Sequence, residues 1–265
     1  MYKFITLFFL WSFQLLAFGQ FEVQKHDEVL KFMLDHHLLN ERSLVVFDID
    51  NTLLKSHHEF GSDQWFNWQS EELIKQSSLS LAKSFDELLD LQAMIFTVGK
   101  MNLVEDSIPE ILQILRTKNI PFIALTSRGP DMRNITEREL IRNGLSLPFN
   151  KFGQDIPVEF IPEMNDRKAS YQKGIFMTSG MHKGQMLKYL LSRFKTNYHS
   201  IIFIDDHKKH TDRVFEIFKI EGIDINTFRY GHEDKKVQNF ISSEKTSSII
   251  LGKKLLELKS ELNNN

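Results

Sequence analysis

The sequence contains no cysteine among its 265 residues. Disulfide bonds, cysteine-ligated zinc, iron–sulfur clusters and cysteine nucleophiles are therefore excluded. An excess of one charge is also missing, because 33 basic and 35 acidic residues give a net charge of −2. Without a basic excess to hold a phosphate backbone, we expect no nucleic-acid partner.

Apolar residues, in contrast, are abundant enough to build a packed core. The chain is 42% hydrophobic and 26% charged, which excludes a globally disordered chain and a collagen-like or coiled-coil fibre. The length favours one sizeable domain with an insertion, or two small domains.

The first 19 residues differ in character from the rest. They combine one early basic residue, Lys3, with an apolar run over residues 4–16 and small residues at Ala17 and Gly19. This pattern is typical of a secretory signal peptide, cleaved after Gly19. An uncleaved membrane anchor is the alternative, although the run is short for a span of roughly 20 residues. We therefore expect a secreted or periplasmic protein, without stable membrane insertion once the signal is removed.

Residues 20–265 alternate between helix-like and strand-like patterns. Apolar residues at helical spacing predict helices, and continuous apolar runs predict buried strands. The helices are expected over residues 24–39, 105–118, 131–143, 184–194 and 211–220, and the strands over 44–47, 120–125, 201–204 and 225–230. Strands that alternate with helices predict an α/β domain with a doubly wound, mainly parallel sheet. The serine-rich stretch over 242–248 and the last three residues predict a loose tail.

A long, mostly helical segment interrupts this alternation after the first expected strand. Residues 53–104 far exceed the usual strand–helix loop of about 2–6 residues. An insertion there lies over the edge of the sheet where such folds bind ligands, so we predict a helical cap. Its aromatic residues Trp65, Phe66 and Trp68 are interpreted as the core of the cap, with substrate contact as the alternative.

Residues that carry chemistry gather at the ends of the expected elements. Acidic pairs follow the first and third strands, two hydroxyl residues follow the second strand, and one lysine opens a helix: Asp48 and Asp50, Asp205 and Asp206, Thr126 and Ser127, and Lys183. Two carboxylates in one pocket can act as nucleophile or metal ligand and as proton donor. Hydroxyl groups beside the free N–H groups of a helix start can hold a phosphate.

The lysine and the nearby histidines have alternative interpretations. Lys183 opposes the helix macrodipole, so it is more easily explained by an anionic ligand. Lys173 also precedes a glycine and is the rival for this role. His207 and His210 follow the second acidic pair; a metal role is open, but a surface role is favoured because carboxylates already form an oxygen site suited to Mg²⁺.

These motifs resemble those of the haloacid dehalogenase-like (HAD) superfamily. Residues 45–52 (VVFDIDNT) match its first motif, residues 123–126 (IALT) its second, Lys183–Gly184 its third and residues 201–206 (IIFIDD) its fourth. The similarity is greatest to a secreted bacterial branch with a helical cap, and weaker to the secreted acid phosphatases of the same superfamily. The resemblance implies a Rossmann-type core and hydrolysis of a small phosphorylated substrate.

The resemblance also implies a role for each matched residue. Asp48 would attack phosphorus and form an aspartyl-phosphate, and Asp50 would act as acid and then as base. Mg²⁺ would be held by Asp48, the backbone carbonyl of Asp50, Asp205 and Asp206, while Thr126, Ser127 and Lys183 would bind the phosphoryl oxygens. Two other functions stay open: a secreted binding protein on a catalytically weak HAD scaffold, and a phosphotransferase.

Overall fold

The fold is organised around an eight-stranded sheet in the order β1-β10-β9-β2-β5-β8-β7-β6. The computed structural model describes residues 18–147, 159–160, 162, 167–194, 198–240 and 242–263. The strands of the eight-stranded sheet are β1 (Gly19–Val23), β2 (Ser43–Phe47), β5 (Phe122–Thr126), β6 (Glu159–Phe160), β7 (Ala169–Gln172), β8 (Ile175–Met177), β9 (Ser200–Asp205) and β10 (Asp224–Tyr230). In the order across the sheet, the neighbouring strands from β1 through β10, β9, β2 and β5 to β8 all pair in parallel. Strands β7 and β6 follow at the far edge and pair antiparallel. The predicted α/β class with a mainly parallel sheet is confirmed.

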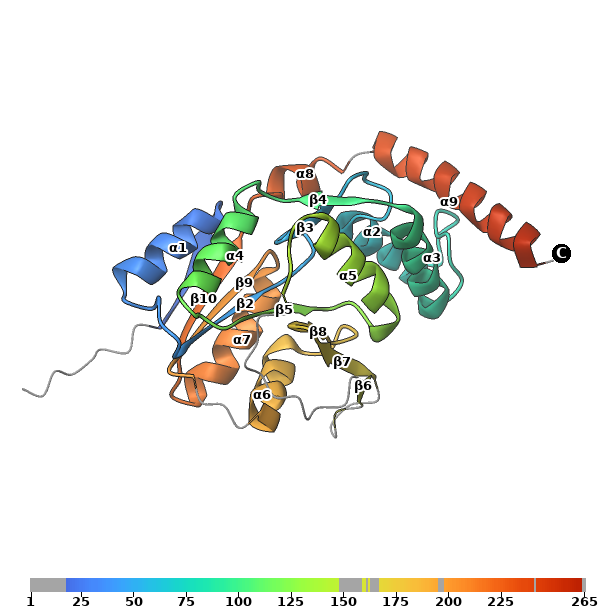
Figure 1. Cartoon of the computed structure of the whole chain (residues 1–265). Coiled ribbons are helices and arrows are strands. Elements are labelled where there is room, and N and C mark those ends of the chain that lie inside the picture. Colours follow the sequence, from blue (N-terminus) through green and yellow to red (C-terminus); the bar gives the residue numbers. More distant parts are fainter. Residues whose placement is uncertain are drawn as a thin grey trace, which may run out of the picture.

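Helices cover both faces of this sheet, as Figure 1 shows. One face carries α1 (His26–Asp35), α4 (Ile108–Thr117) and α5 (Arg133–Arg142), which follows the short 3₁₀ turn Pro130–Met132. The other face carries α6 (Lys183–Phe194) and α7 (Lys208–Ile220). Strand β2 alternates between the two layers: Val45 and Phe47 pack with the α1 and α4 side, and Leu44 and Val46 with the α6 and α7 side. A strand buried on both faces explains the continuous apolar run in the sequence.

The edge strand β1 was not predicted. It pairs in parallel with β10, and the Phe21 ring stacks on Phe228 with 5.1 Å between ring centroids. The leading helix is correspondingly shorter than expected, at His26–Asp35 instead of residues 24–39. Residues 1–17, which hold most of the predicted signal peptide, lie outside the described residues. A cut after Gly19 would remove the first residue of β1.

The inserted segment is a helical pair on a two-stranded stalk. Antiparallel strands β3 (Leu54–Ser56) and β4 (Met101–Leu103) flank α2 (Asp63–Ile74) and α3 (Phe85–Val98). Ser62 and Ser84 cap the two helices, since each hydroxyl oxygen accepts a hydrogen bond from the N–H three residues on, at 3.2 Å. Such caps satisfy amide groups that a helix start leaves free. We call residues 53–104 the insertion from here on.

The insertion has a small apolar core of its own. Trp65 and Trp68 pack there with Leu88, Leu91 and Ile95, and Trp65 is fully buried. The interpretation of these two tryptophans as packing residues agrees with their burial.

The expectation of a loose tail over residues 242–248 is wrong. Helix α9 (Ser242–Asn263) follows the short helix α8 (Asp234–Gln238) and packs on the insertion (Figure 1). Ser248 and Gly252 share the face of α9 that lies against the insertion, and a Cβ atom at Gly252 would lie 2.4 Å from Leu81 Cδ1. These small residues permit the helix to approach the insertion closely. In a second contact, Lys245 Nζ lies 5.4 Å from the centroid of the Trp68 ring. Serine suggests a loop in isolation, but here it provides a tight helix contact.

We predict that Trp65→Ala lowers the free energy of unfolding by about 3–5 kcal/mol, because it removes a fully buried aromatic side chain and leaves a cavity. Denaturant unfolding of the full chain measures this change. The matched control is Ile74→Ala on the same helix, where the side chain is 82% exposed and the change should stay within about 0.5 kcal/mol. Equal effects of the two substitutions would contradict the packing role.

Candidate functional site

The register of the central strands brings two acids to the same level of the sheet. Strands β2 and β9 are paired with Phe47 opposite Ile204, and the N–H of Asp48 donates to the carbonyl of Ile204 at 2.8 Å. Asp48 therefore leaves β2 beside Asp205, the last residue of β9. Neighbouring carboxyl ends in a parallel sheet are where ligands bind in folds of this kind.

A tight turn follows Asp48 and separates it from Asp50. The N–H groups of Thr52, Leu53 and Leu54 all point to the carbonyl oxygen of Ile49, at 2.9–3.3 Å. Asn51 adopts a φ of +54°, in the left-handed region that asparagine tolerates better than most residues. The turn reverses the chain so that Asp48 and Asp50 are presented at different points of the edge.

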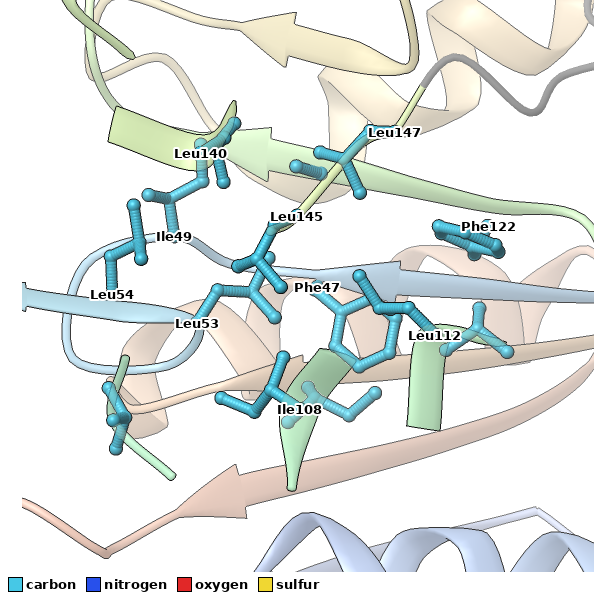
Figure 2. Packing of buried hydrophobic residues seen from close by; sticks show 14 of the residues in the cluster. Phe47, Ile49, Leu53, Leu54, Ile108, Leu112, Phe122, Leu140, Leu145 and Leu147 are labelled. Atoms are coloured by element: carbon cyan, nitrogen blue, oxygen red, sulfur yellow. The ribbon is translucent and has the colours of Figure 1, made fainter. Parts of the chain in front are cut away.

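Apolar residues interleaved with the acids anchor this turn. Figure 2 shows Ile49, Leu53 and Leu54 in the same cluster as Phe47 and Leu145, under the α4 and α5 side of the sheet. The three turn residues are fully buried. Each buried aliphatic side chain contributes roughly 1.5–3 kcal/mol, so the turn is held firmly by its apolar members.

Lys183 joins the two strand ends. Its Nζ donates to Asp48 Oδ1 at 2.5 Å and to Asp205 Oδ2 at 2.6 Å. All three side chains are buried, with exposed fractions of 1%, 6% and 0% for Lys183, Asp48 and Asp205. The two carboxylates raise the pKa of Lys183 against the opposing effect of burial, so the lysine stays charged. We call these three residues the Lys183 triad.

Asp206 adds a third carboxylate beside the Lys183 triad. Oxygen atoms of Asp48, Asp205 and Asp206 all lie within 4.8 Å of one another. Burial, followed by the neighbouring acids, raises the pKa of Asp206, and burial raises that of Asp48 to about 7 even though Lys183 opposes the shift. One cation therefore does not offset three carboxylates. Asp206 Oδ1 is moreover buried without a hydrogen-bond partner in the part of the chain that the structure describes.

This donor set fits a hard divalent cation. Carboxylate oxygens are the ligands that Mg²⁺ and Ca²⁺ prefer, and the excess negative charge would be offset by such an ion. Asp48, Asp205 and Asp206 could each supply an oxygen.

The insertion reaches the same edge through Asp63, the first residue of α2. Its Oδ2 lies 3.0 Å from His207 Nε2, and the same ring nitrogen lies 3.9 Å from Asp206. The hydrogen bond to Asp63, together with the charge of Asp206, raises the pKa of His207 to about 10 despite burial. His207 thus links the insertion to the core, a role that its place in the sequence did not reveal. Burial, and next the charge of Lys183, lower the pKa of the neighbouring His210 to about 4.

Asp50 has a different cationic partner, Arg128, which sequence reasoning missed. The guanidinium holds the carboxylate with two hydrogen bonds, Nε to Oδ2 at 2.9 Å and Nη2 to Oδ1 at 2.7 Å. Arg128 is buried, whereas the Asp50 side chain is 25% exposed. The arginine stands in the stretch TSRG directly after Thr126 and Ser127, so its place at a strand end was a usable signal.

The remaining predicted residues occupy less central positions. Thr126 is buried, and its hydroxyl oxygen accepts a hydrogen bond from the N–H of Arg128 at 3.2 Å. Ser127, by contrast, is exposed, and its carbonyl accepts a hydrogen bond from Gly180. Lys173 is exposed in the β7–β8 turn and pairs with Glu137 at 2.8 Å. The structure thus brings Lys183, and not Lys173, to the acids.

Together, the fold and this edge define an α/β protein with a buried site of carboxylates and lysine. The family described as "Protein of unknown function (DUF2608)" matches residues 22–256, and the chain belongs to that family. Among the described residues, no helix combines the length and the apolar character that a membrane span requires.

Two chlamydial proteins are similar to the chain over about two thirds of its length. A protein of Chlamydia trachomatis serovar D named "Putative outer membrane protein" is 24% identical over 179 residues, which cover 68% of this chain and 65% of the relative. A protein of Chlamydia muridarum with the same name is 22% identical over 184 residues, covering 69% and 67%. The names connect these relatives with the cell envelope.

We predict that Lys183→Met lowers the free energy of unfolding by about 3–5 kcal/mol, because removal of one partner leaves buried charges unpaired. This loss of unfolding free energy should grow as the pH rises from about 5 to about 8. Carboxyl groups with a raised pKa are protonated at the lower pH and charged at the higher one, so the missing cation matters more at the higher pH. Urea unfolding at both pH values measures it. Lys173→Met is the control and should change stability by less than about 0.5 kcal/mol; a similar loss there, or none at Lys183, would refute the triad's importance.

Proposed function

We propose that this protein is a Mg²⁺-dependent phosphate monoester hydrolase of the HAD type that acts through an aspartyl-phosphate. The observation that carries this proposal is the Lys183 triad, with Asp206 beside it at the carboxyl edge of a parallel sheet. Residues from the first, third and fourth motifs of the resemblance lie together there, and a lysine beside carboxylates is an arrangement that suits phosphoryl transfer.

Asp48 is the proposed nucleophile. Its carboxylate oxygen would form a bond to phosphorus as the bond to the substrate oxygen breaks, giving an aspartyl-phosphate and an alkoxide. The ammonium of Lys183, 2.5 Å from Asp48 Oδ1, holds the carboxylate in place and supplies positive charge where the phosphoryl oxygens would lie. Preorganised charge in a buried site costs no rearrangement during the reaction.

Asp50 is the proposed acid and base. Its proton would pass to the leaving alkoxide, and Asp50 would then take a proton from the water that attacks the aspartyl-phosphate, so that phosphate and the starting enzyme are restored. The 25% exposure of its side chain supports this role, because the group must meet both substrate and water. Its cationic partner is Arg128, whereas that of Asp48 is Lys183.

Mg²⁺ is the proposed cofactor. Asp48, Asp205 and Asp206 would hold it, and the resemblance adds the backbone carbonyl of Asp50. The buried Asp206 Oδ1, which lacks a hydrogen-bond partner among the described residues, supports this assignment. When bound, the ion would neutralise part of the negative charge on the transferring phosphoryl group.

The substrate class follows from the insertion and the charge of the chain. A small phosphorylated molecule fits a buried edge whose access the insertion would control as a cap, through the Asp63–His207 link. A binding protein without catalysis is less well supported, since it has little need for a lysine buried between two acids at a desolvation cost of several kcal/mol per ion. A phosphotransferase would use the same first step with an alcohol in place of water.

We also propose that the protein works in the cell envelope. The pattern of residues 1–19 and the names of the two chlamydial relatives support export. A fractionation that finds the mature chain in the cytoplasm would contradict this assignment without affecting the proposed chemistry.

Asp48→Asn should reduce phosphatase activity by about 10³–10⁶-fold, because the amide keeps the size but removes the nucleophile and one ligand charge. Release of nitrophenol from an aryl phosphate measures activity, and EDTA should abolish it until Mg²⁺ is restored. The matched control is Asp212→Asn on α7, an exposed carboxylate that pairs with Lys208, and it should retain wild-type turnover. Normal turnover in Asp48→Asn, or insensitivity to EDTA, would refute the proposal.

Asp50→Asn should slow the hydrolysis of alkyl phosphates by about 10²–10⁴-fold, the usual contribution of general acid–base catalysis. The loss should be smaller for nitrophenyl phosphate, since that leaving group departs without a proton. Measurement of kcat for both substrates gives the ratio. Equal losses on both would leave Asp50 with a structural or metal-site role only.

A further inference from the structure

The Arg128 guanidinium touches more than Asp50. Its Nη1 donates to Thr136 Oγ1 on α5 at 2.9 Å, and its Nη2 lies 3.1 Å from Met101 Sδ on β4. Its carbon Cζ lies 4.3 Å from the centroid of the Phe96 ring on α3. Two of these neighbours belong to the core and two to the insertion. The arginine therefore stands where the insertion meets the proposed acid.

We propose that Arg128 is a positioning residue for Asp50, and that Phe96 and Met101 make this positioning depend on the insertion. The inference rests on the proposed function, because it concerns the residue to which the acid–base role is assigned. The inference adds that the insertion controls the orientation of the Asp50 carboxyl group as well as access to the site.

The geometry favours positioning over direct substrate binding. Both carboxylate oxygens of Asp50 accept from one planar guanidinium, and a two-point pair of this kind fixes orientation as well as distance. The Arg128 side chain is only 4% exposed, and Asp50, Thr136 and Met101 occupy its three nitrogen atoms. Asp50 is the more exposed partner, at 25%.

The contacts that Phe96 and Met101 make with Arg128 can make the position of the guanidinium depend on the position of the insertion. A cation over an aromatic face is attracted most strongly when the ring is centred on it, and desolvation strengthens the effect. Phe96 is 8% exposed, so the contact is buried. A shift of α3 relative to the core would move this ring, and the guanidinium would lose this contact.

The test is a double-mutant cycle that combines Arg128→Lys with Asp50→Asn. Lysine keeps the charge but cannot form the two-point pair. With Asp50 present, Arg128→Lys should lower kcat for an alkyl phosphate by about 10- to 100-fold, the loss typical of a catalytic group misplaced by roughly 1 Å. KM should change by less than about twofold, because the arginine does not touch the substrate. In the Asp50→Asn background the same substitution should have almost no further effect.

Phe96→Leu provides a second and gentler variant. It should lower kcat by about two- to fivefold, as expected for loss of a cation–π contact, and this effect should also vanish in the Asp50→Asn background. Phe66→Leu is the matched control in the insertion, since Phe66 packs against Phe85 on the neighbouring helix. Arg133→Lys is the control for a buried arginine whose partners, Ser170 and Glu137, lie outside the site; any effect it has should be equal in both backgrounds.

The outcomes separate this inference from the proposed function. Loss of the Arg128 and Phe96 effects in the Asp50→Asn background supports the inference. Equal effects in both backgrounds, or a rise in KM alone, overturn it and assign Arg128 a structural or phosphate-binding role, while wild-type hydrolysis that depends on Asp48 leaves the proposed function standing. If Arg128→Lys does not fold, Phe96→Leu decides between these outcomes on its own.

Discussion

The bridge from Lys183 to Asp48 and Asp205 is the interaction on which the rest of the site depends. Two parallel strands end at the same level, so their terminal carboxylates face each other in a buried space. Without a cation between them the strand ends would repel, and in a medium of low effective dielectric this repulsion is severe. Helix α6 begins at this point and brings the lysine in. The polarity of the first turn of α6 is unfavourable for a cation, but the two carboxylates outweigh it.

Apolar packing around the site offsets the destabilisation that these buried charges cause. The turn after Asp48 buries Ile49, Leu53 and Leu54, so every charged position in it is flanked by side chains fixed in the core. An acid with a raised pKa is unfavourable for folding at neutral pH, and Asp48 is such an acid. A site of this kind persists because the surrounding core stabilises the fold by more than the site destabilises it.

Much of this arrangement could be predicted from the sequence, because strand ends and helix starts are local features. Asp48, Asp205 and Lys183 each stand at such an end, and parallel pairing brings such ends together without further information. Arg128 also stands just after a strand end and could have been found in the same way, whereas the Asp63–His207 link could not, since it depends on how the insertion packs on the core. Strand β1 was hidden for another reason: its five residues show no clear alternation and begin within the predicted signal peptide. Helix α9 was missed because serine and glycine suggest a loop until a partner surface requires small residues.

The acids of the site divide between two cations, and this division has chemical consequences. Asp48 shares Lys183 with Asp205 in a buried space, whereas Asp50 has Arg128 to itself at the edge of solvent. The two carboxylates therefore differ in burial and in cationic partner, although they stand only two residues apart in the chain. The insertion touches both halves, through His207 beside Asp206 and through Phe96 against Arg128. A movement of the insertion would therefore disturb the surroundings of Asp206 and of Arg128 together, whereas Asp48, Asp205 and Lys183 are held by core elements alone.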